Sequence, residues 1–126
     1  MVSGVCLLVA GVVRATLPGS EFSVAWEHSV EKIEWSERYH VEGDRLRIVE
    51  ARIQGNGAGM QAPAGAMLAD GVWSWQPATQ LLPELRLTYS TFTTDYRLCD
   101  AGRCRTLAEV AGPLASGDVV TVRACR

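Results

Sequence analysis

The sequence predicts an all-β fold, an antiparallel β-sandwich or a partly open barrel of about seven to eight short strands. Apolar and polar residues alternate with a period of two in several short segments, which is typical of strands with one buried face. Turn signals rich in Gly, Pro and Asp separate these segments at intervals of about ten residues. The chain has 126 residues, 48% of them hydrophobic, which is enough for one domain with its own core. We therefore expect a single β domain over residues 1–126.

The charge of the chain argues against a nucleic-acid partner. Twelve Lys and Arg residues are scattered among fourteen Asp and Glu residues, and the net charge is −2. No segment concentrates basic residues into the positive face that phosphate binding requires. No recognised cofactor motif occurs either. We expect no cofactor, no nucleic acid and a monomer, and we leave membrane association open.

The N-terminal apolar run, residues 5–13, has two interpretations. Its nine residues, VCLLVAGVV, are far fewer than the roughly twenty needed to span a bilayer as a helix. The run has the length of the apolar core of an export signal, but no Lys or Arg precedes it. The alternative is a buried first strand that extends to about Ala15 and is ended by the Pro-Gly turn at 16–20. Residues 1–15 are therefore an atypical signal segment or an apolar first strand.

The densest chemistry lies between residues 22 and 41, which contain two tryptophans and both histidines of the chain. Two alternating runs, 22–30 and 33–41, predict antiparallel strands or one long bent strand. A helix over 29–38 is the competing interpretation, but its apolar residues do not continue a 3.6-residue stripe. The residues that share a face are Phe22, Val24, Trp26, His28 and Val30 in the first run, and Ile33, Trp35, Glu37, Tyr39 and Val41 in the second.

The remaining elements follow from turn chemistry. The Gly-Asp pair at 43–44 predicts a hairpin into a strand at 46–53. The glycine-rich segment 54–65 is not compatible with a regular element, so we expect a loop there. Further strands are expected at 72–76, 85–92, 95–99 and 119–125, with one helical turn at 106–110.

Four cysteines form a short pair and a distant pair. Cys99 and Cys104 flank a turn that contains Asp and Gly, and such a turn can bring two strand ends within the roughly 4.4 to 6.8 Å that a disulfide requires. Of the three pairings we favour Cys99–Cys104 and Cys6–Cys125, the second joining the first strand to the last. A zinc site is the weaker alternative, because this cysteine spacing occurs once and the histidines lie far away in the sequence. Disulfides imply an oxidising compartment, so we expect a periplasmic or other extracytoplasmic location.

The first candidate site residues are two neighbours, His28 and Ser29, and two glutamates. His28 and Ser29 suggest a base and a nucleophile, but adjacent residues on a strand point to opposite faces and cannot meet without a bulge. A metal site built from His28, His40, Glu31 and Glu37 has no diagnostic spacing. We assign no catalytic residue and no metal. His28 is either a structural histidine bonded to a nearby carboxylate or a recognition group that faces a cleft with Glu31 and Glu37.

The glycine-rich segment and the tryptophans supply the other candidates. The sequence GNGAGM superficially resembles a dinucleotide fingerprint, but no amphipathic helix follows and Pro63 interrupts the place where one would begin. The segment is either a structural loop or the backbone-lined lip of a ligand site. Trp35, Trp73 and Trp75 are core aromatics or, where exposed, a binding platform. The candidate ligand-binding residues are therefore His28, Ser29, Glu31, Trp35, Glu37, Gly57, Gly59 and Met60.

Five motifs spread over nearly the whole chain carry a family resemblance. They are HSVEK-x-x-W-x-E-x-Y at 28–39, V-E-A-R-I-x-G-x-GAGM at 49–60, D-G-x-W at 70–73, P-E-L-R-L at 83–87 and L-C-D-A-G-x-C-R at 98–105. Together they resemble a bacterial family, the domain-of-unknown-function family 1850. The resemblance implies a small exported protein associated with TRAP-type transporters of the TAXI class, which use extracytoplasmic solute-binding proteins. It implies no established activity.

Two hypotheses about function come from these observations. The first is a non-enzymatic extracytoplasmic binding or accessory domain that assists a TRAP-type transport system by binding its subunits or a small solute. The second is a small-molecule or metal-binding enzyme that uses His28, Glu31 and Glu37. The cysteine pattern, the small β plan and the resemblance favour the first hypothesis.

Overall fold

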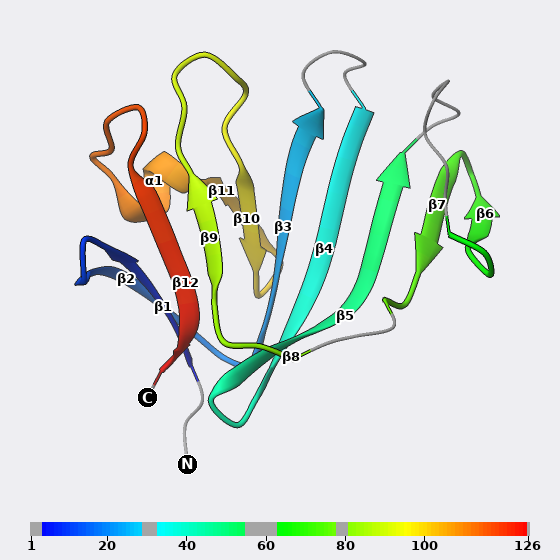
Figure 1. Cartoon of the computed structure of the whole chain (residues 1–126), viewed down its shortest axis with the longest axis horizontal. Helices are drawn as coiled ribbons and strands as arrows, with labels where there is room; N and C mark the ends of the chain where they lie inside the picture. Colours follow the sequence, from blue (N-terminus) through cyan, green and yellow to red (C-terminus); the bar gives the residue numbers. More distant parts are fainter. Residues whose placement is uncertain (1–3, 29–32, 55–62, 78–80, 126) are drawn as a thin grey trace.

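The computed structural model describes residues 4–28, 33–54, 63–77 and 81–125, and these residues form two antiparallel sheets that pack face to face (Figure 1). The arrangement is nearly all β and open at one side, which confirms the predicted β-sandwich class. No helix within the described ranges is long and apolar enough to cross a membrane.

The small sheet has four strands in the order β2-β1-β12-β9. Their bounds are β1 Gly4–Val9, β2 Val12–Pro18, β12 Val119–Cys125 and β9 Leu85–Thr88. All six residues of β1 are buried, because β1 is a central strand between β2 and β12. The two chain ends described by the structure therefore meet in this sheet, where Gly4 pairs with Cys125.

The expected first strand to about Ala15 is wrong in one respect, because the apolar run contains a hairpin. Ala10 and Gly11 have φ values of 52° and 80°, and they turn the chain between β1 and β2. A turn made of Ala and Gly carries no polar signal, so the run reads as continuous in the sequence. The consequence is an exposed edge strand, in which Val12 and Val13 remain open to solvent.

The large sheet follows the order β11-β10-β3-β4-β5-β7-β6, and β8 pairs with one end of β5. Neighbouring strands are antiparallel, as predicted for 22–41, and a helix over residues 33–38 is wrong because β4 occupies them. A register shift between Arg38 and Tyr39 leaves Val49 of β5 as an extra residue. The bounds are β3 Glu21–His28, β4 Ile33–Glu42, β5 Arg45–Gln54, β6 Met67–Ala69, β7 Val72–Trp75, β8 Leu81–Leu82, β10 Arg97–Asp100 and β11 Arg103–Thr106.

Between β9 and β10 the structure departs from the expected strands at 85–92 and 95–99. Strand β9 ends at Thr88, and Tyr89 then forms backbone hydrogen bonds with Gly117 and Asp118, which precede β12. Phe92, which fits a strand by composition, is 90% exposed. The expected helical turn forms as α1 Leu107–Ala111, with a capping box between Thr106 and Glu109.

The hydrophobic core lies between the small sheet and only part of the large one. From the small sheet and α1 the cluster includes Val5, Leu7, Val9, Leu17, Leu87, Val120, Val122, Leu107 and Ala111. From the large sheet it includes Phe22, Val24, Tyr39, Val41, Leu46 and Leu98. Ile33, Ala51 and Ile53 are also buried, but they lie outside this cluster. In Figure 1, β5, β7 and β6 extend to the right, beyond the strands of the small sheet.

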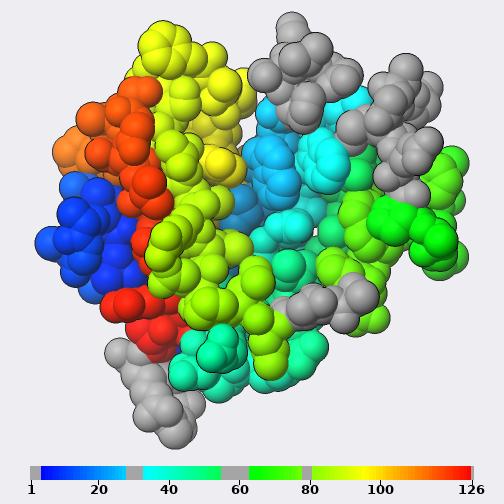
Figure 2. Space-filling view, in the orientation of Figure 1, coloured from blue at the N-terminus to red at the C-terminus, as the bar shows by residue number. Residues whose placement is uncertain are grey.

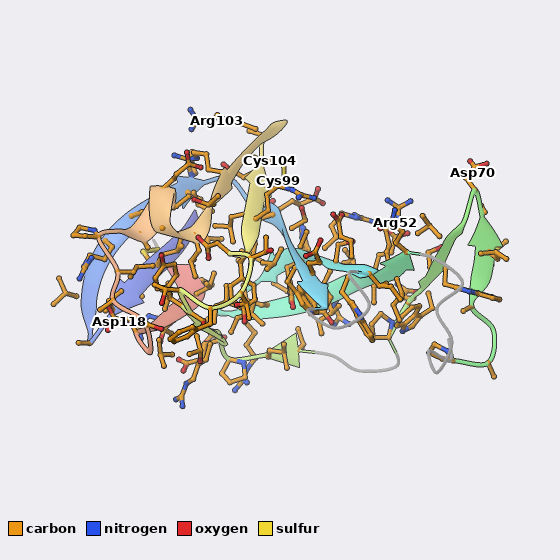
Figure 3. All side chains as sticks on the ribbon, turned by 90° about the horizontal axis from the view of Figure 1, so that it is seen from above. Arg52, Asp70, Cys99, Arg103, Cys104 and Asp118 are labelled. Carbon is orange, nitrogen blue, oxygen red and sulfur yellow. A yellow bond between two sulfur atoms is a disulfide. The ribbon has the colours of Figure 1, made fainter. Side chains whose placement is uncertain are left out.

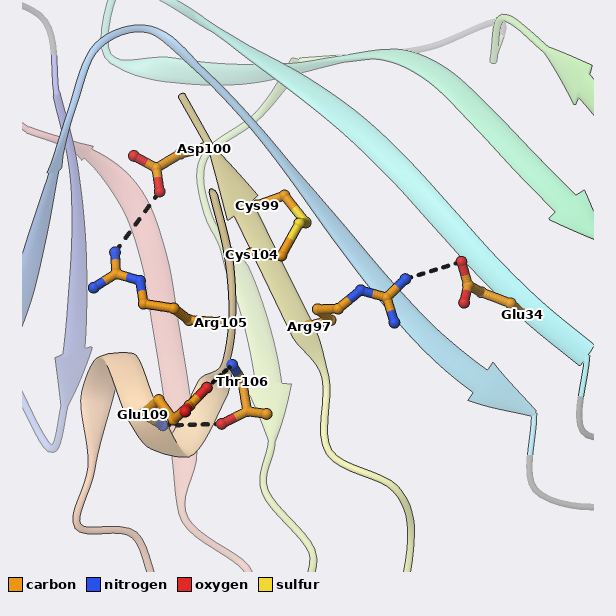
Figure 4. Close-up of a disulfide and its surroundings, with 8 residues drawn as sticks. All are labelled: Glu34, Arg97, Cys99, Asp100, Cys104, Arg105, Thr106 and Glu109. Carbon is orange, nitrogen blue, oxygen red and sulfur yellow. Dashed lines mark hydrogen bonds and ion pairs between the residues drawn. A yellow bond between two sulfur atoms is a disulfide. The ribbon is translucent and has the colours of Figure 1, made fainter. Parts of the chain in front are cut away.

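The two disulfides are the ones favoured from the sequence. Cys6 bonds to Cys125 and joins β1 to β12 within the small sheet. Cys99 and Cys104 are directly opposite each other across the β10–β11 hairpin, whose turn residues Ala101 and Gly102 have positive φ (Figure 4). All four cysteines of the chain are consumed in these bonds, so the zinc alternative through cysteine is wrong.

Candidate functional site

The register of β3, β4, β5 and β7 places all four tryptophans of the chain on one face of the large sheet. One row across the strands is Trp26, Trp35, Ile53 and Trp73, and the next row is Val24, Glu37, Ala51 and Trp75. Paired residues in adjacent strands point to the same side of a sheet. We call Trp26, Trp35, Glu37, Trp73 and Trp75 the tryptophan face.

The tryptophan face is partly open to solvent. Each of its four tryptophans and Glu37 is half-buried. The rings of Trp26 and Trp35 are stacked, with centroids 6.3 Å apart and an angle of 18° between the planes. In Figure 2 the blue and cyan atoms of β3 and β4 are visible in a hollow between the yellow-green atoms around β9 and the green atoms of β6 and β7.

The opposite face of the same strands is a charged surface with most of its charges paired. Arg97 lies 3.1 Å from Glu34, and Glu50 lies 3.8 Å from Arg38 and 3.7 Å from Arg52. Figure 3 shows Arg52 and the Cys99–Cys104 disulfide on the same side of the large sheet. The two faces therefore differ in chemistry, since one is aromatic with a single carboxylate and the other carries ion pairs.

Glu37 is held in place by the hydroxyl of Tyr39, which donates a hydrogen bond to its carboxylate. Tyr39 itself is buried, and its ring stacks on Phe22 with centroids 5.1 Å apart. Burial, together with the adjacent carboxylate, raises the pKa of the Tyr39 hydroxyl above its ordinary value, so the hydroxyl stays protonated and acts as a donor. Among the described residues, Glu37 has no other hydrogen-bond donor and no ion-pair partner.

A polar atom of Trp35 has no hydrogen-bond partner among the described residues. The indole Nε1 of Trp35 is buried, and no acceptor among the described residues reaches it. A buried donor without an acceptor is uncommon and unfavourable.

A comparison with known protein families covers the strands that carry the tryptophan face. The family described as Domain of unknown function (DUF1850) matches residues 22–107, more than half of the chain. The chain belongs to this family. No curated protein and no solved structure matches it. The DUF1850 match runs from β3 to the start of α1 and includes every residue of the tryptophan face, whereas β1, β2 and β12 lie outside it.

Two of the eight ligand-binding candidates, Trp35 and Glu37, lie on the tryptophan face of this DUF1850 chain. His28 ends β3, where its backbone pairs with Ile33, and its side chain is outside the description. The other five candidates also lie outside the described residues: Ser29, Glu31, Gly57, Gly59 and Met60. Of the enzyme hypothesis, only the Glu37 side chain can be placed, and the described residues contain no group of three or more metal-ligating side chains.

Sequence reasoning missed Trp26 and Tyr39 as members of this site and left Trp73 and Trp75 undecided between core and platform. The signal for the first two was present, because Trp35, Glu37 and Tyr39 alternate along one strand and Trp26 shares its face in the preceding strand. The pairing of β5 with β7 was the missing information. It brings Trp73 opposite Ile53 and Trp75 opposite Ala51.

A shallow hollow of about 200 Å³ on the other side of the sheet is a weaker candidate site. It lies beside the Cys99–Cys104 hairpin and is lined in part by Glu21, Arg38 and Asp100. Arg38 and Asp100 already have partners of opposite charge within 4.0 Å, namely Glu50 and Arg105, and Glu21 lies 3.5 Å from Nδ1 of His40. The hollow therefore offers little unsatisfied charge to a ligand.

Proposed function

We propose that this DUF1850 chain is a non-enzymatic extracytoplasmic binding domain that holds a small organic solute on its tryptophan face. The observation that carries the proposal is the gathering of all four tryptophans on one open sheet face. Ligand sites are concave and mostly aromatic or apolar, with a few polar groups that fix the orientation of the ligand. The tryptophan face has this composition, because Glu37 is the one charged side chain in its two rows.

The two disulfides support a location outside the reducing cytoplasm. Titration of free thiols in the denatured, unreduced protein tests this part. We expect no reactive thiol, and four thiols per chain would contradict an oxidising compartment.

The role beside a TRAP-type transporter of the TAXI class rests on the family resemblance alone. In this role the domain binds a solute and assists the transporter subunits that carry it. A tagged chain isolated from gently solubilised membranes of its host should bring the transporter subunits with it, whereas an unrelated tagged β domain should not. A chain that emerges alone under every gentle condition contradicts the accessory role but leaves solute binding to its own test.

Solute binding is tested by thermal unfolding in the presence of a panel of sugars, amino acids, amines and carboxylates. A solute present at about a hundred times its Kd stabilises the folded state by about 2.7 kcal/mol, which corresponds to a rise in Tm of roughly 10 °C for a domain of this size. We expect Trp75→Ala to lose this shift. Ser74→Ala is the matched control, since Ser74 is the neighbour of Trp75 and pairs with Arg52 on the opposite face. No shift with any solute, or equal shifts in both variants, contradicts the proposal.

A further inference from the structure

We infer that the solute bound by the tryptophan face is an organic cation, an amine or quaternary ammonium group with an apolar or flat body. The inference rests on the proposed function, because it uses the same face and names the class of solute. In it, the Glu37 carboxylate binds the cationic group, and ring faces of Trp35 and Trp75 contact the rest of the molecule.

The first argument is the charge balance of this face. The two rows across β3, β4, β5 and β7 contain Glu37 as their one charged residue. Of the arginines in these strands, Arg38 and Arg52 pair with Glu50 on the other face, and Arg47 pairs with Glu42. Among the residues that the structure describes, no cation lies within ion-pair distance of the partly buried Glu37 carboxylate, and burying a carboxylate without a charged partner is unfavourable. A cationic ligand supplies the missing charge.

The second argument is the hydrogen bonding of Glu37. A carboxylate has about four positions at which it can accept hydrogen bonds. The Tyr39 hydroxyl fills one of them from the covered half of the same sheet face, because Tyr39 belongs to the hydrophobic core. This bond fixes the orientation of the carboxylate and leaves its remaining lone pairs for a donor on the open side. An ammonium group is such a donor.

The third argument is the spacing of the rings around Glu37. Trp35 lies two residues earlier on the same face of β4, at roughly 6 to 7 Å along the strand. Trp75 is reached across Ala51, two strand spacings or roughly 10 Å from Glu37. Ala51, which lies between them, has a small side chain and is itself buried. The face of a tryptophan ring attracts cations more strongly than that of any other side chain. In this arrangement, a cation bound at Glu37 contacts both rings when its apolar body extends over these separations of roughly 6 to 10 Å.

Fluorescence titration of the purified full chain tests the inference, because all four tryptophans lie on this face and report on its occupancy. The probes are benzyltrimethylammonium, choline and 3,3-dimethylbutan-1-ol, the neutral isostere of choline, with glucose as a neutral sugar. We expect saturable changes with the two cations and a Kd at least tenfold higher for the isostere than for choline. Equal affinity for choline and its isostere, or stronger binding of glucose, overturns the inference.

Glu37→Gln removes the charge at nearly constant shape, and we expect it to raise the Kd for both cations at least tenfold. The matched control is Glu50→Gln, which removes a carboxylate from the opposite face of the same sheet and should leave the Kd unchanged. An unchanged Kd in Glu37→Gln overturns the inference. Should Glu37→Gln not fold, the comparison of choline with its isostere in the unaltered protein decides alone. If the cations fail while another solute in the thermal panel binds, the cation is wrong and the proposed function stands.

Discussion

The inner face of the large sheet consists of two halves that follow the same alternation but differ in what covers them. Under the small sheet it carries Val24, Val41 and Leu46, which are buried in the common core. Beyond the small sheet it carries the half-buried residues Trp35, Trp73 and Trp75. The first half closes the fold, whereas the second is an aromatic surface that the described strands leave partly open.

Tyr39 and Glu37 mark the border between these halves. Tyr39 belongs to the core and Glu37 to the tryptophan face, and one hydrogen bond joins them. Residues two apart on a strand share a face, so a single strand passes from the closed half to the open one without changing side. Trp26 packs against the core, whereas Trp35, Trp73 and Trp75 lie outside it, so the comparison teaches that the fold leaves three of its tryptophans available to a ligand.

The largest difference in the free energy of unfolding is expected between variants that lack one or the other disulfide. Cys6–Cys125 holds the covering sheet and spans 119 residues, whereas Cys99–Cys104 closes a hairpin and spans 5 residues. Loop entropy in the unfolded chain predicts losses of about 5 kcal/mol for Cys6→Ala with Cys125→Ala and about 2 kcal/mol for Cys99→Ala with Cys104→Ala. Urea denaturation of the two double variants measures both losses. Equal losses would contradict the expectation that the longer loop closed by Cys6–Cys125 makes this disulfide the more stabilising one.

The next comparison uses the same substitution in each half. Leu46 is 0% exposed in the core, and Leu68 is 56% exposed opposite Trp73 at the open end. We expect Leu46→Ala to lower the free energy of unfolding by about 2 to 5 kcal/mol, through lost burial and a cavity. Leu68→Ala should lower it by less than about 1 kcal/mol. Losses of similar size in urea denaturation would mean that the open half is packed as tightly as the core.

The closed half was predictable from the sequence to a greater degree than the open one. Alternation placed Phe22 and Val24 on one face of the first run and Tyr39 on one face of the second, and the turn with Asp and Gly identified the Cys99–Cys104 pair, because both are local patterns. The tryptophan face depends on β5 pairing with β7, and the long glycine-rich segment between these strands hides that pairing. The Ala10–Gly11 turn was missed because both residues count as apolar.

We expect Tyr39, at the border between the halves, to make the stability of the fold depend on alkaline pH. Burial raises the pKa of Tyr39 above the ordinary value of 10.0. Above about pH 10 the unfolded chain therefore releases a proton that the folded chain keeps, so stability falls as pH rises, by about 1.4 kcal/mol per pH unit for one such tyrosine. Tyr39→Phe should make this fall shallower by that amount.

Urea denaturation between pH 9 and pH 11 measures this slope. Tyr96, whose pKa is also raised by burial and by Asp95, remains in both proteins, so part of the decrease in stability with rising pH remains in Tyr39→Phe. An identical slope in Tyr39→Phe would mean that the Tyr39 hydroxyl is not protected by the core.

The smallest change in the free energy of unfolding is expected for a substitution on the charged face, opposite the tryptophan face. Arg97 and Glu34 form an ion pair at 3.1 Å, but both side chains are about half exposed, and such pairs contribute less than about 1 kcal/mol. Arg97→Ala should therefore change the free energy of unfolding by less than that amount, and the change should shrink in high salt. Its tryptophan emission should match that of the unaltered protein, because Arg97 pairs with Ala25 on the far side of the sheet from the rings. A shifted emission would mean that the two faces are coupled, and the charged face could then no longer serve as the control for the tryptophan face.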